Sequence, residues 1–237
     1  APLHAQESGS NIVTWNAGIN SPSAWYLETI SPKIGLGNQI ESAQKAVDEN
    51  TGTNPGFISP DHETVSSLEA SIAAAEDVYN ASGSTKTDYE NAIADLEAAT
   101  ATMLNAPKNE VVVSTDADET WYYLVSAADP AENAYCAGKV IVETQDADGN
   151  PLLQFMAKEE NNDYMLWKVV DAGSGQYAFQ NKASGLYIGA DQSLTQSAAA
   201  YNIVSLGENG QYNIKQEGSN PLHAQENGSM IVTWSGG

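Results

Sequence analysis

The sequence predicts a multidomain protein in which an all-β part accompanies an all-α part. Fourteen residues near the start, Pro2 to Trp15, return near the other end as Pro221 to Trp234 with only two differences. Between them, residues 36–106 are rich in Ala and Glu, with apolar side chains at helical spacing. The region after Pro107 has short apolar runs separated by polar turns instead. Repetition on this scale is typical of folds assembled from similar units.

Residues 36–106 are expected to form a three-helix bundle. Gly, Asn, Pro and Ser interrupt the helical pattern twice, and Pro107 follows the last stretch. The second and third helices are expected to begin at Asp61 and Thr87, because these residue types accept hydrogen bonds from first-turn amides. Three apolar stripes mark the helices: Ile40 to Val47, Val65 to Tyr79, and Tyr89 to Met103.

Residues 110–237 are expected to form three repeats of short strands. Three repeats of four strands would close a β-trefoil, which leaves no unpaired sheet edge. The third repeat has only three of its four strands here. The expected strands are 122–126, 134–137, 152–157 and 164–170 in the first repeat, 176–181, 186–190, 193–197 and 200–205 in the second, and 211–216, 222–225 and 229–234 in the third.

Residues 1–30 are predicted to form strands of a trefoil repeat, although the helical segment 36–106 separates them in sequence from the C-terminal β region. Trp25 aligns with Trp167 and Tyr201, the aromatic residues of two fourth strands. Residues 23–30 are therefore expected to complete the C-terminal trefoil, either within the chain or in a neighbouring molecule as a strand-swapped assembly. A tail of a preceding trefoil in a tandem array is the alternative origin.

The charge and composition of the chain disfavour several classes of binding partner. The chain has 31 acidic residues against nine Lys and a formal charge of −22, so nucleic acid and anionic membrane surfaces are unfavourable partners. Apolar runs are too short for membrane insertion. The single cysteine, Cys136, is expected to be a small buried residue. An acidic chain rich in Asn, Gly, Ser and Thr suits an exported bacterial protein, secreted or at the cell surface.

Catalytic chemistry is not indicated, and we expect no enzyme, no cofactor and no metal. His4 and His223 are repeat equivalents without a motif of fixed spacing, which favours structural roles. Carboxylate pairs are too common in so acidic a chain to predict a glycosidase. Asp146 to Asn150 resembles part of a calcium loop but lacks the later Glu, which favours a hairpin turn.

Aromatic side chains beside polar ones are the remaining candidates for binding. Sugar sites combine an aromatic face with amide and carboxylate groups that reach hydroxyls. Core roles are expected for Trp25, Trp121, Trp167 and Tyr201, since trefoil strands place large apolar residues in the barrel. The candidate sites are Tyr187 with Asp191 and Gln192, Trp234 with His223, Gln225 and Asn227, and Tyr135 with Asp148 and Asn150.

Two family resemblances accompany these residues. A polar hairpin followed by an aromatic fourth strand resembles the ricin-B-like trefoil lectins, with Val232-Thr233-Trp234 where that family has Gln-x-Trp. The stretches from Leu36 to Ala43, Leu68 to Ala75 and Tyr89 to Leu96 are similar to FIVAR modules of bacterial surface proteins. These resemblances imply a non-catalytic module that binds glycans or polysaccharides, or adheres. A structural spacer or strand-exchanging module without a ligand is the alternative.

Overall fold

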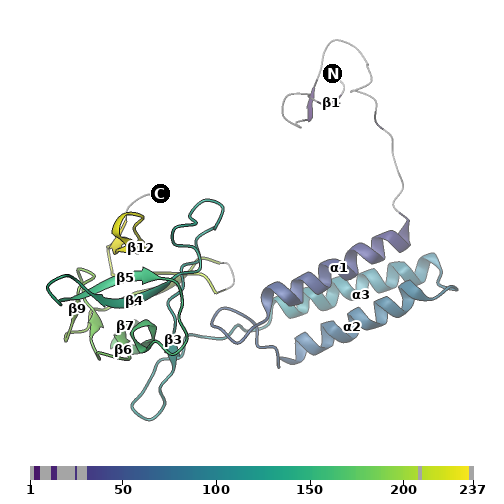
Figure 1. Cartoon of the computed structure of the whole chain (residues 1–237). Helices are drawn as coiled ribbons and strands as arrows, with labels where there is room; N and C mark the ends of the chain where they lie inside the picture. Colours follow the sequence, from purple (N-terminus) through teal and green to yellow (C-terminus); the bar gives the residue numbers. More distant parts are fainter. Residues whose placement is uncertain (1–2, 6–11, 15–24, 26–30, 208–209, 235–237) are drawn as a thin grey trace. The chain divides into compact units, whose positions relative to one another are not determined.

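A computed structural model describes residues 3–5, 12–14, 25, 31–207 and 210–234. It contains three helices and many short antiparallel strands (Figure 1). Contacts within the chain define two compact units of different character. One unit comprises Ala1–Ala46 and Ser67–Met103, and the other comprises Val47–Ser66 and Leu104–Gly237.

The helices coincide with the three predicted apolar stripes and run side by side in Figure 1. Lys33 Nζ lies 4.7 Å from the ring centre of Tyr79, which joins the first helix to the second. A Cβ on Gly35 would lie 3.5 Å from Ile93 Cδ1, which brings the first helix against the third. The helices are α1 (Pro32–Asn50), α2 (Glu63–Asn80) and α3 (Lys86–Leu104).

The N-terminus of α3 is capped two residues earlier than the sequence predicted. Thr85 Oγ1 accepts a hydrogen bond from the Asp88 amide at 3.3 Å, and Asp88 Oδ2 accepts one from the Thr85 amide at 2.7 Å. This reciprocal pair is a capping box and satisfies two amides that the helix itself leaves free. The expectation for Thr87 was therefore wrong: Thr87 also has an acidic residue three positions later, Glu90, but Thr85 and Asp88 form the capping pair and the helix already begins at Lys86.

The described residues of the β-rich unit form one five-stranded sheet and three separate hairpins, all antiparallel. The sheet has the order β3 (Trp121–Tyr122), β6 (Trp167–Gly173), β7 (Gln176–Asn181), β8 (Tyr187–Ile188) and β9 (Leu194–Thr195). The hairpins are β4 (Val140–Gln145) with β5 (Pro151–Met156), β10 (Asn202–Ser205) with β11 (Tyr212–Lys215), and β12 (Leu222–Ala224) with β13 (Ile231–Thr233).

One apolar core joins strands from all three predicted repeats. Trp167 and Tyr201 are buried in it together with Phe179, whose ring meets that of Tyr201 edge to face at 5.9 Å. Trp121 is only half-buried, and Trp25 is 53% exposed, so the expectation that both are core residues was wrong. Further buried members are Cys136, Leu153, Phe155, Val169, Ile188 and Ile231. Cys136 is thus the small buried residue that was expected.

The repeated sequence folds the same way twice. Strands β1 (Leu3–Ala5) and β2 (Ile12–Thr14) form a hairpin in which Leu3 pairs with Thr14. In β12–β13 the equivalent residues, Leu222 and Thr233, pair in the same register. Apart from Trp25, the segment 23–30 that was predicted to close a barrel lies outside the described residues.

One predicted strand is absent. Residues 134–137 form successive turns, in which the Cys136 and Ala137 amides donate to the Asn133 carbonyl at 3.0 Å. The second strand of this repeat is β4 instead. The preceding Asp129 also ties the chain into a turn, because its side chain accepts the Ala131 amide at 2.8 Å. Local bonds of this kind compete with sheet pairing.

Candidate functional site

An aromatic pair on the β12–β13 hairpin, the exposed Trp234 and the half-buried His223, forms the third-repeat candidate site. His223 lies in β12, and Trp234 follows β13 directly, so both lie at the open end of the hairpin. Their rings stack with centroids 5.9 Å apart and an angle of 25° between planes. Trp234 is 56% exposed, and its amide donates to the Pro221 carbonyl at 3.4 Å. The pair therefore offers an aromatic face to solvent from a fixed backbone.

Gln225 and Asn227 lie at the other end of the same hairpin, in its loop. Both side chains are exposed, and the Gln225 amide donates to the Met230 carbonyl at 2.8 Å, which closes the loop. Gln225 is two positions beyond His223, a span of about 7 Å along a strand. The predicted third-repeat candidates thus share one hairpin, with the aromatic pair at its base and the amides at its tip.

The hairpin is anchored to the body of the β-rich unit from one side. Gln154 of β5 donates through Nε2 to the Gly228 carbonyl at 3.1 Å and pairs with Met230 as an isolated bridge. The hydroxyl of Tyr135 donates to the Ala224 carbonyl at 3.3 Å. Ile231 is 5% exposed in the core. These contacts hold the backbone of β12–β13 and leave Trp234 exposed.

The second-repeat candidates surround the turn between β8 and β9. Tyr187 is half-buried within the sheet, where it pairs with Gln180 and Thr195. The Asp191 carboxylate accepts hydrogen bonds from the amide and the hydroxyl of Ser193, and these bonds lower its pKa below the usual value of 3.8. A carboxylate bonded in this way stabilises the turn, and its remaining lone pairs face solvent.

Gln192 adopts a left-handed backbone conformation, with φ at 64°, and its side chain folds back to the Ala190 carbonyl at 3.1 Å. Sequence reasoning missed a nearby residue, Gln216, whose Nε2 also donates to that carbonyl, at 2.6 Å. Gln216 comes from the third repeat, so no local signal pointed to it. The hydroxyl of Tyr201 completes the network by donating to the Gly189 carbonyl at 2.7 Å. These polar groups stabilise the turn rather than opening it to a ligand.

The first-repeat candidates are not brought together. Tyr135 packs on Phe155 of β5 with ring centroids 6.3 Å apart. Asp148 and Asn150 lie in the β4–β5 turn, and Phe155 is five residues beyond Asn150, about 16 Å along an extended strand. Tyr135 therefore supports β5 and β12, and no first-repeat site of the predicted kind is formed.

The β4–β5 turn is the hairpin turn that the sequence favoured over a calcium loop. Asp146 Oδ1 accepts the amides of Asp148 and Asn150 at 2.9 and 2.8 Å, and the Asn150 side chain donates to Asp146 Oδ2 at 3.0 Å. These bonds lower the pKa of Asp146 below its usual value. N–H donors directed at both carboxylate oxygens occupy the positions that a cation would need.

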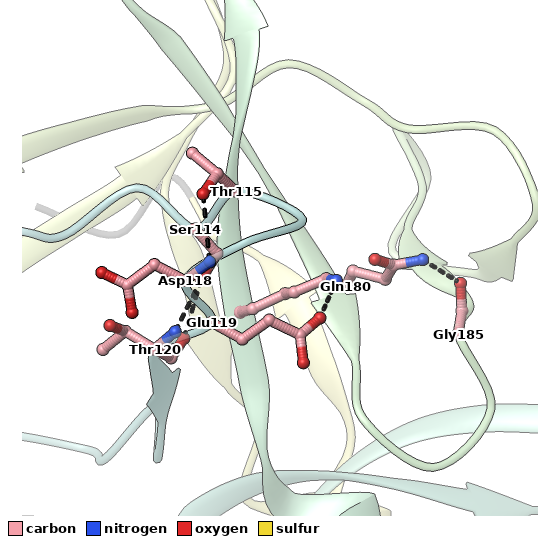
Figure 2. Close-up of polar contacts among 8 residues, drawn as sticks. Ser114, Thr115, Asp118, Glu119, Thr120, Gln180 and Gly185 are labelled. Atoms are coloured by element: carbon pink, nitrogen blue, oxygen red, sulfur yellow. Dashed lines mark hydrogen bonds and ion pairs between the residues drawn. The ribbon is translucent and has the colours of Figure 1, made fainter.

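Acidic residues elsewhere in the β-rich unit also have structural roles. Figure 2 shows the turn before β3, in which Ser114 and Thr120 exchange two hydrogen bonds of 3.0 Å. The Asp118 amide donates to the Thr115 hydroxyl at 3.2 Å. Glu119 forms a 2.7 Å ion pair with Lys168 of β6. This cluster fixes the start of β3, and the Glu119 carboxylate is held by its ion pair with Lys168.

His62 also makes only local hydrogen bonds, at the start of a helix. His62 precedes α2 and caps it, because its Nδ1 accepts the Thr64 amide at 3.3 Å; the expected cap, Asp61, does not. Among the residues that the structure describes, no three His, Cys, Asp or Glu side chains gather as a metal site would require. Within the same residues, no helix has the length and apolar character to cross a membrane.

Comparison with known proteins gives only distant likenesses. No family model matches the chain, and no curated protein matches it. Half of the chain is similar to the crystal structure of a designed 3-fold symmetric protein, ThreeFoil, with 18% identity and a TM-score of 0.34 over 49% of this chain and 91% of that one. A PSL1a–E64 complex is similar with 18% identity and a TM-score of 0.31 over 50% and 44% of the two chains. At these TM-scores neither likeness carries an argument.

Proposed function

We propose that this chain is a non-catalytic carbohydrate-binding or adhesive module that uses the β12–β13 hairpin. One observation carries the proposal: Trp234 keeps 56% of its surface exposed while it stacks on His223. A large apolar ring costs free energy when it is left in water, so an exposed Trp that is held in place is typical of a binding surface.

The hairpin offers both kinds of contact that a sugar needs. The apolar face of a pyranose ring packs on an indole, and the exposed amides of Gln225 and Asn227 are donors and acceptors for hydroxyl groups. Trp234, Gln225 and Asn227 are all exposed and are spread along the hairpin, which suits an extended polysaccharide better than a small enclosed ligand. No catalytic step belongs to this proposal, in which His223 serves as the stacking partner of the indole.

The proposal extends to the architecture and the location of the protein. We assign the β-rich unit to a β-trefoil of the ricin-B-like kind, because its hairpins recur and share one core. The three helices are assigned to a FIVAR-like bundle that spaces the binding unit. Secretion or display on a bacterial cell surface follows from the composition rather than from any structural feature.

Affinity electrophoresis through gels that contain plant, fungal and bacterial polysaccharides tests the binding. We expect the chain to be retarded by at least one of them, and Trp234→Ala to reduce the retardation at least threefold. The double variant Trp15→Ala with Trp234→Ala also removes the equivalent tryptophan of the N-terminal repeat and so tests whether that copy contributes to binding. The matched control is Tyr164→Ala, which removes another exposed aromatic ring outside the hairpin. A screen without any retardation, or equal losses for Trp234→Ala and Tyr164→Ala, would contradict the proposal.

A second candidate function is a structural spacer or a strand-exchanging assembly module with no ligand of its own. The specific observation in its favour is the duplicated hairpin: β12–β13 packs against the core, whereas Leu3 and Ile12 of β1–β2 are exposed. A chain that passes through every polysaccharide gel unretarded, while it still self-associates, would favour this second function.

A further inference from the structure

The N-terminal hairpin, β1–β2, has apolar residues whose equivalents in β12–β13 pack in the core of the β-rich unit. Ile231 of β13 is 5% exposed, whereas its repeat equivalent in β2, Ile12, is 53% exposed. Leu222 is half-buried against the core, and its equivalent Leu3 is 56% exposed. The same residues in the same register therefore lie in the core in one copy and in solvent in the other.

The side-chain contacts that hold β12–β13 against the β-rich unit could also be made to the N-terminal copy. Gln154 binds the carbonyl of Gly228, and Tyr135 binds the carbonyl of Ala224. Both contacts use backbone oxygens. The matching positions of the first copy are again Gly and Ala, namely Gly9 and Ala5. The N-terminal copy thus has the backbone groups and the apolar side chains that the position of β12–β13 requires.

The strand after the hairpin gives the N-terminal copy an additional contact. In the first repeat the backbone of Trp167 pairs with that of Tyr122 across two antiparallel strands, and in the second repeat Tyr201 pairs with Tyr177 in the same way. Tyr212 is the equivalent of those tyrosines in the third repeat. Among residues 31–207 and 210–234 it has no aromatic residue bridged to it in this way. By sequence, the aromatic residue for that position is Trp25.

Trp25 already resembles the aromatic residue of a fourth strand. Its Nε1 donates to the Leu3 carbonyl of β1 at 3.1 Å. In the first repeat, Trp167 Nε1 donates at the same distance to the Ile141 carbonyl of β4, which is the second strand of its own repeat. Trp167 is fully buried, but Trp25 is 53% exposed. The described part of the N-terminal copy thus reproduces the hydrogen bond that the fourth-strand aromatic residue makes within the first repeat.

We propose that β1–β2 and Trp25 of one chain replace β12–β13 in a second copy of the chain. The exchange places Ile12 in the site of Ile231 and Trp25 opposite Tyr212. Donor and acceptor surfaces differ, so the contact is head-to-tail and produces rings or linear assemblies. This inference deepens the second candidate function and does not depend on glycan binding, which the gel assay reads out separately.

Light scattering over a range of protein concentrations tests the exchange on the full chain. We expect masses that rise above the 25.1 kDa monomer with concentration. Ile12→Asp is expected to weaken the association at least tenfold, because it places a charge at the site of a core residue. Its control is Thr14→Asp, since Thr14 and its equivalent Thr233 are both exposed. A monomer at all concentrations, or the same effect from both variants, would overturn the proposal.

Disulfide trapping identifies the partner strand. Gln154 and Met230 pair as an antiparallel bridge, a spacing that a disulfide spans. The repeat equivalent of Met230 is Asn11, so Asn11→Cys with Gln154→Cys is expected to give covalent multimers under oxidation. Gln154→Cys alone is the control and is expected to give no covalent multimers. A disulfide within one chain, or no disulfide at all, would overturn exchange between copies even in a chain that binds a polysaccharide.

Discussion

Gly56 is expected to be one of the least replaceable residues of the β-rich unit. It has a φ of 85°, and a Cβ at this position would lie 2.5 Å from the amide nitrogen and 2.8 Å from the Cα of Gly210. Its own amide donates to the Asn109 carbonyl at 2.8 Å, so the backbone has little freedom to move away. Gly56→Ala therefore combines a strained conformation with a clash between two backbones.

The two costs can be separated with a matched glycine. Gly173 has the same φ of 85°, but a Cβ there would meet nothing within 4 Å. The left-handed conformation alone costs an L-residue about 1–2 kcal/mol, which is the expected loss of unfolding free energy for Gly173→Ala. The clash adds about 1–3 kcal/mol, as overpacking does elsewhere. Gly56→Ala is thus expected to cost about 3.5 kcal/mol in total.

Thermal unfolding followed by tryptophan fluorescence measures the difference. For a unit of this size each kcal/mol lowers the Tm by about 3 °C, so we expect roughly 10 °C for Gly56→Ala and 5 °C for Gly173→Ala. Circular dichroism before heating verifies that both variants fold. Equal shifts for the two variants would refute the reasoning, because they would show that the loop containing Gly56 does not touch Gly210.

Three further outcomes are expected. Tyr201→Phe removes the 2.7 Å hydrogen bond to the Gly189 carbonyl and a long one, 3.5 Å, from Gln216 Nε2. Because the Gly189 carbonyl keeps its bond from the Gln192 amide and Gln216 keeps its bond to the Ala190 carbonyl, the change should cost about 1 kcal/mol in urea unfolding; a cost above about 3 kcal/mol would contradict this. Burial raises the pKa of Tyr201 above 10.0, so the stability it contributes should be complete below pH 10 and fall as the pH rises beyond it, an alkaline loss that Tyr201→Phe should reduce. Hydrogen bonds from Thr85 lower the pKa of Asp88 below 3.8, so its contribution should be present above that pH and disappear in stronger acid; helix content followed by circular dichroism should lose this acid dependence in Asp88→Asn, and an unchanged profile would argue against the cap.

Periodicity and repetition predicted much of the fold. The strand expected at residues 176–181 is β7 with the same bounds, and the three apolar stripes are helical. The helix cap and the strand at 134–137 were wrong because local hydrogen bonds decided both. Thr85 and Asp88 cap the helix together, and residues 134–137 turn through bonds from the Cys136 and Ala137 amides to the Asn133 carbonyl. Local hydrogen bonds of this kind compete with helix and sheet hydrogen bonds, and the spacing of apolar residues does not predict which of them forms.

The candidate site was partly predictable for a related reason. His223 pairs with Val232 across the hairpin, so the register alone places Trp234 diagonally beside His223. The contacts of Gln216 with Ala190 and of Gln154 with Gly228 join different repeats, and nothing in the local sequence indicates them. The exposure of Trp25 was also unexpected, because its sequence resembles a core strand while the covering body is absent from its unit.

The indole N–H resonances of the chain test the central claim most directly. In a ¹H–¹⁵N spectrum, titration with a polysaccharide that retards the protein in a gel is expected to shift the signal of Trp234, assigned from Trp234→Ala. The signal of the buried Trp167, whose Nε1 is bound to the Ile141 carbonyl, should stay in place. A titration that shifts other resonances and leaves that of Trp234 unchanged would contradict the β12–β13 hairpin as the binding surface.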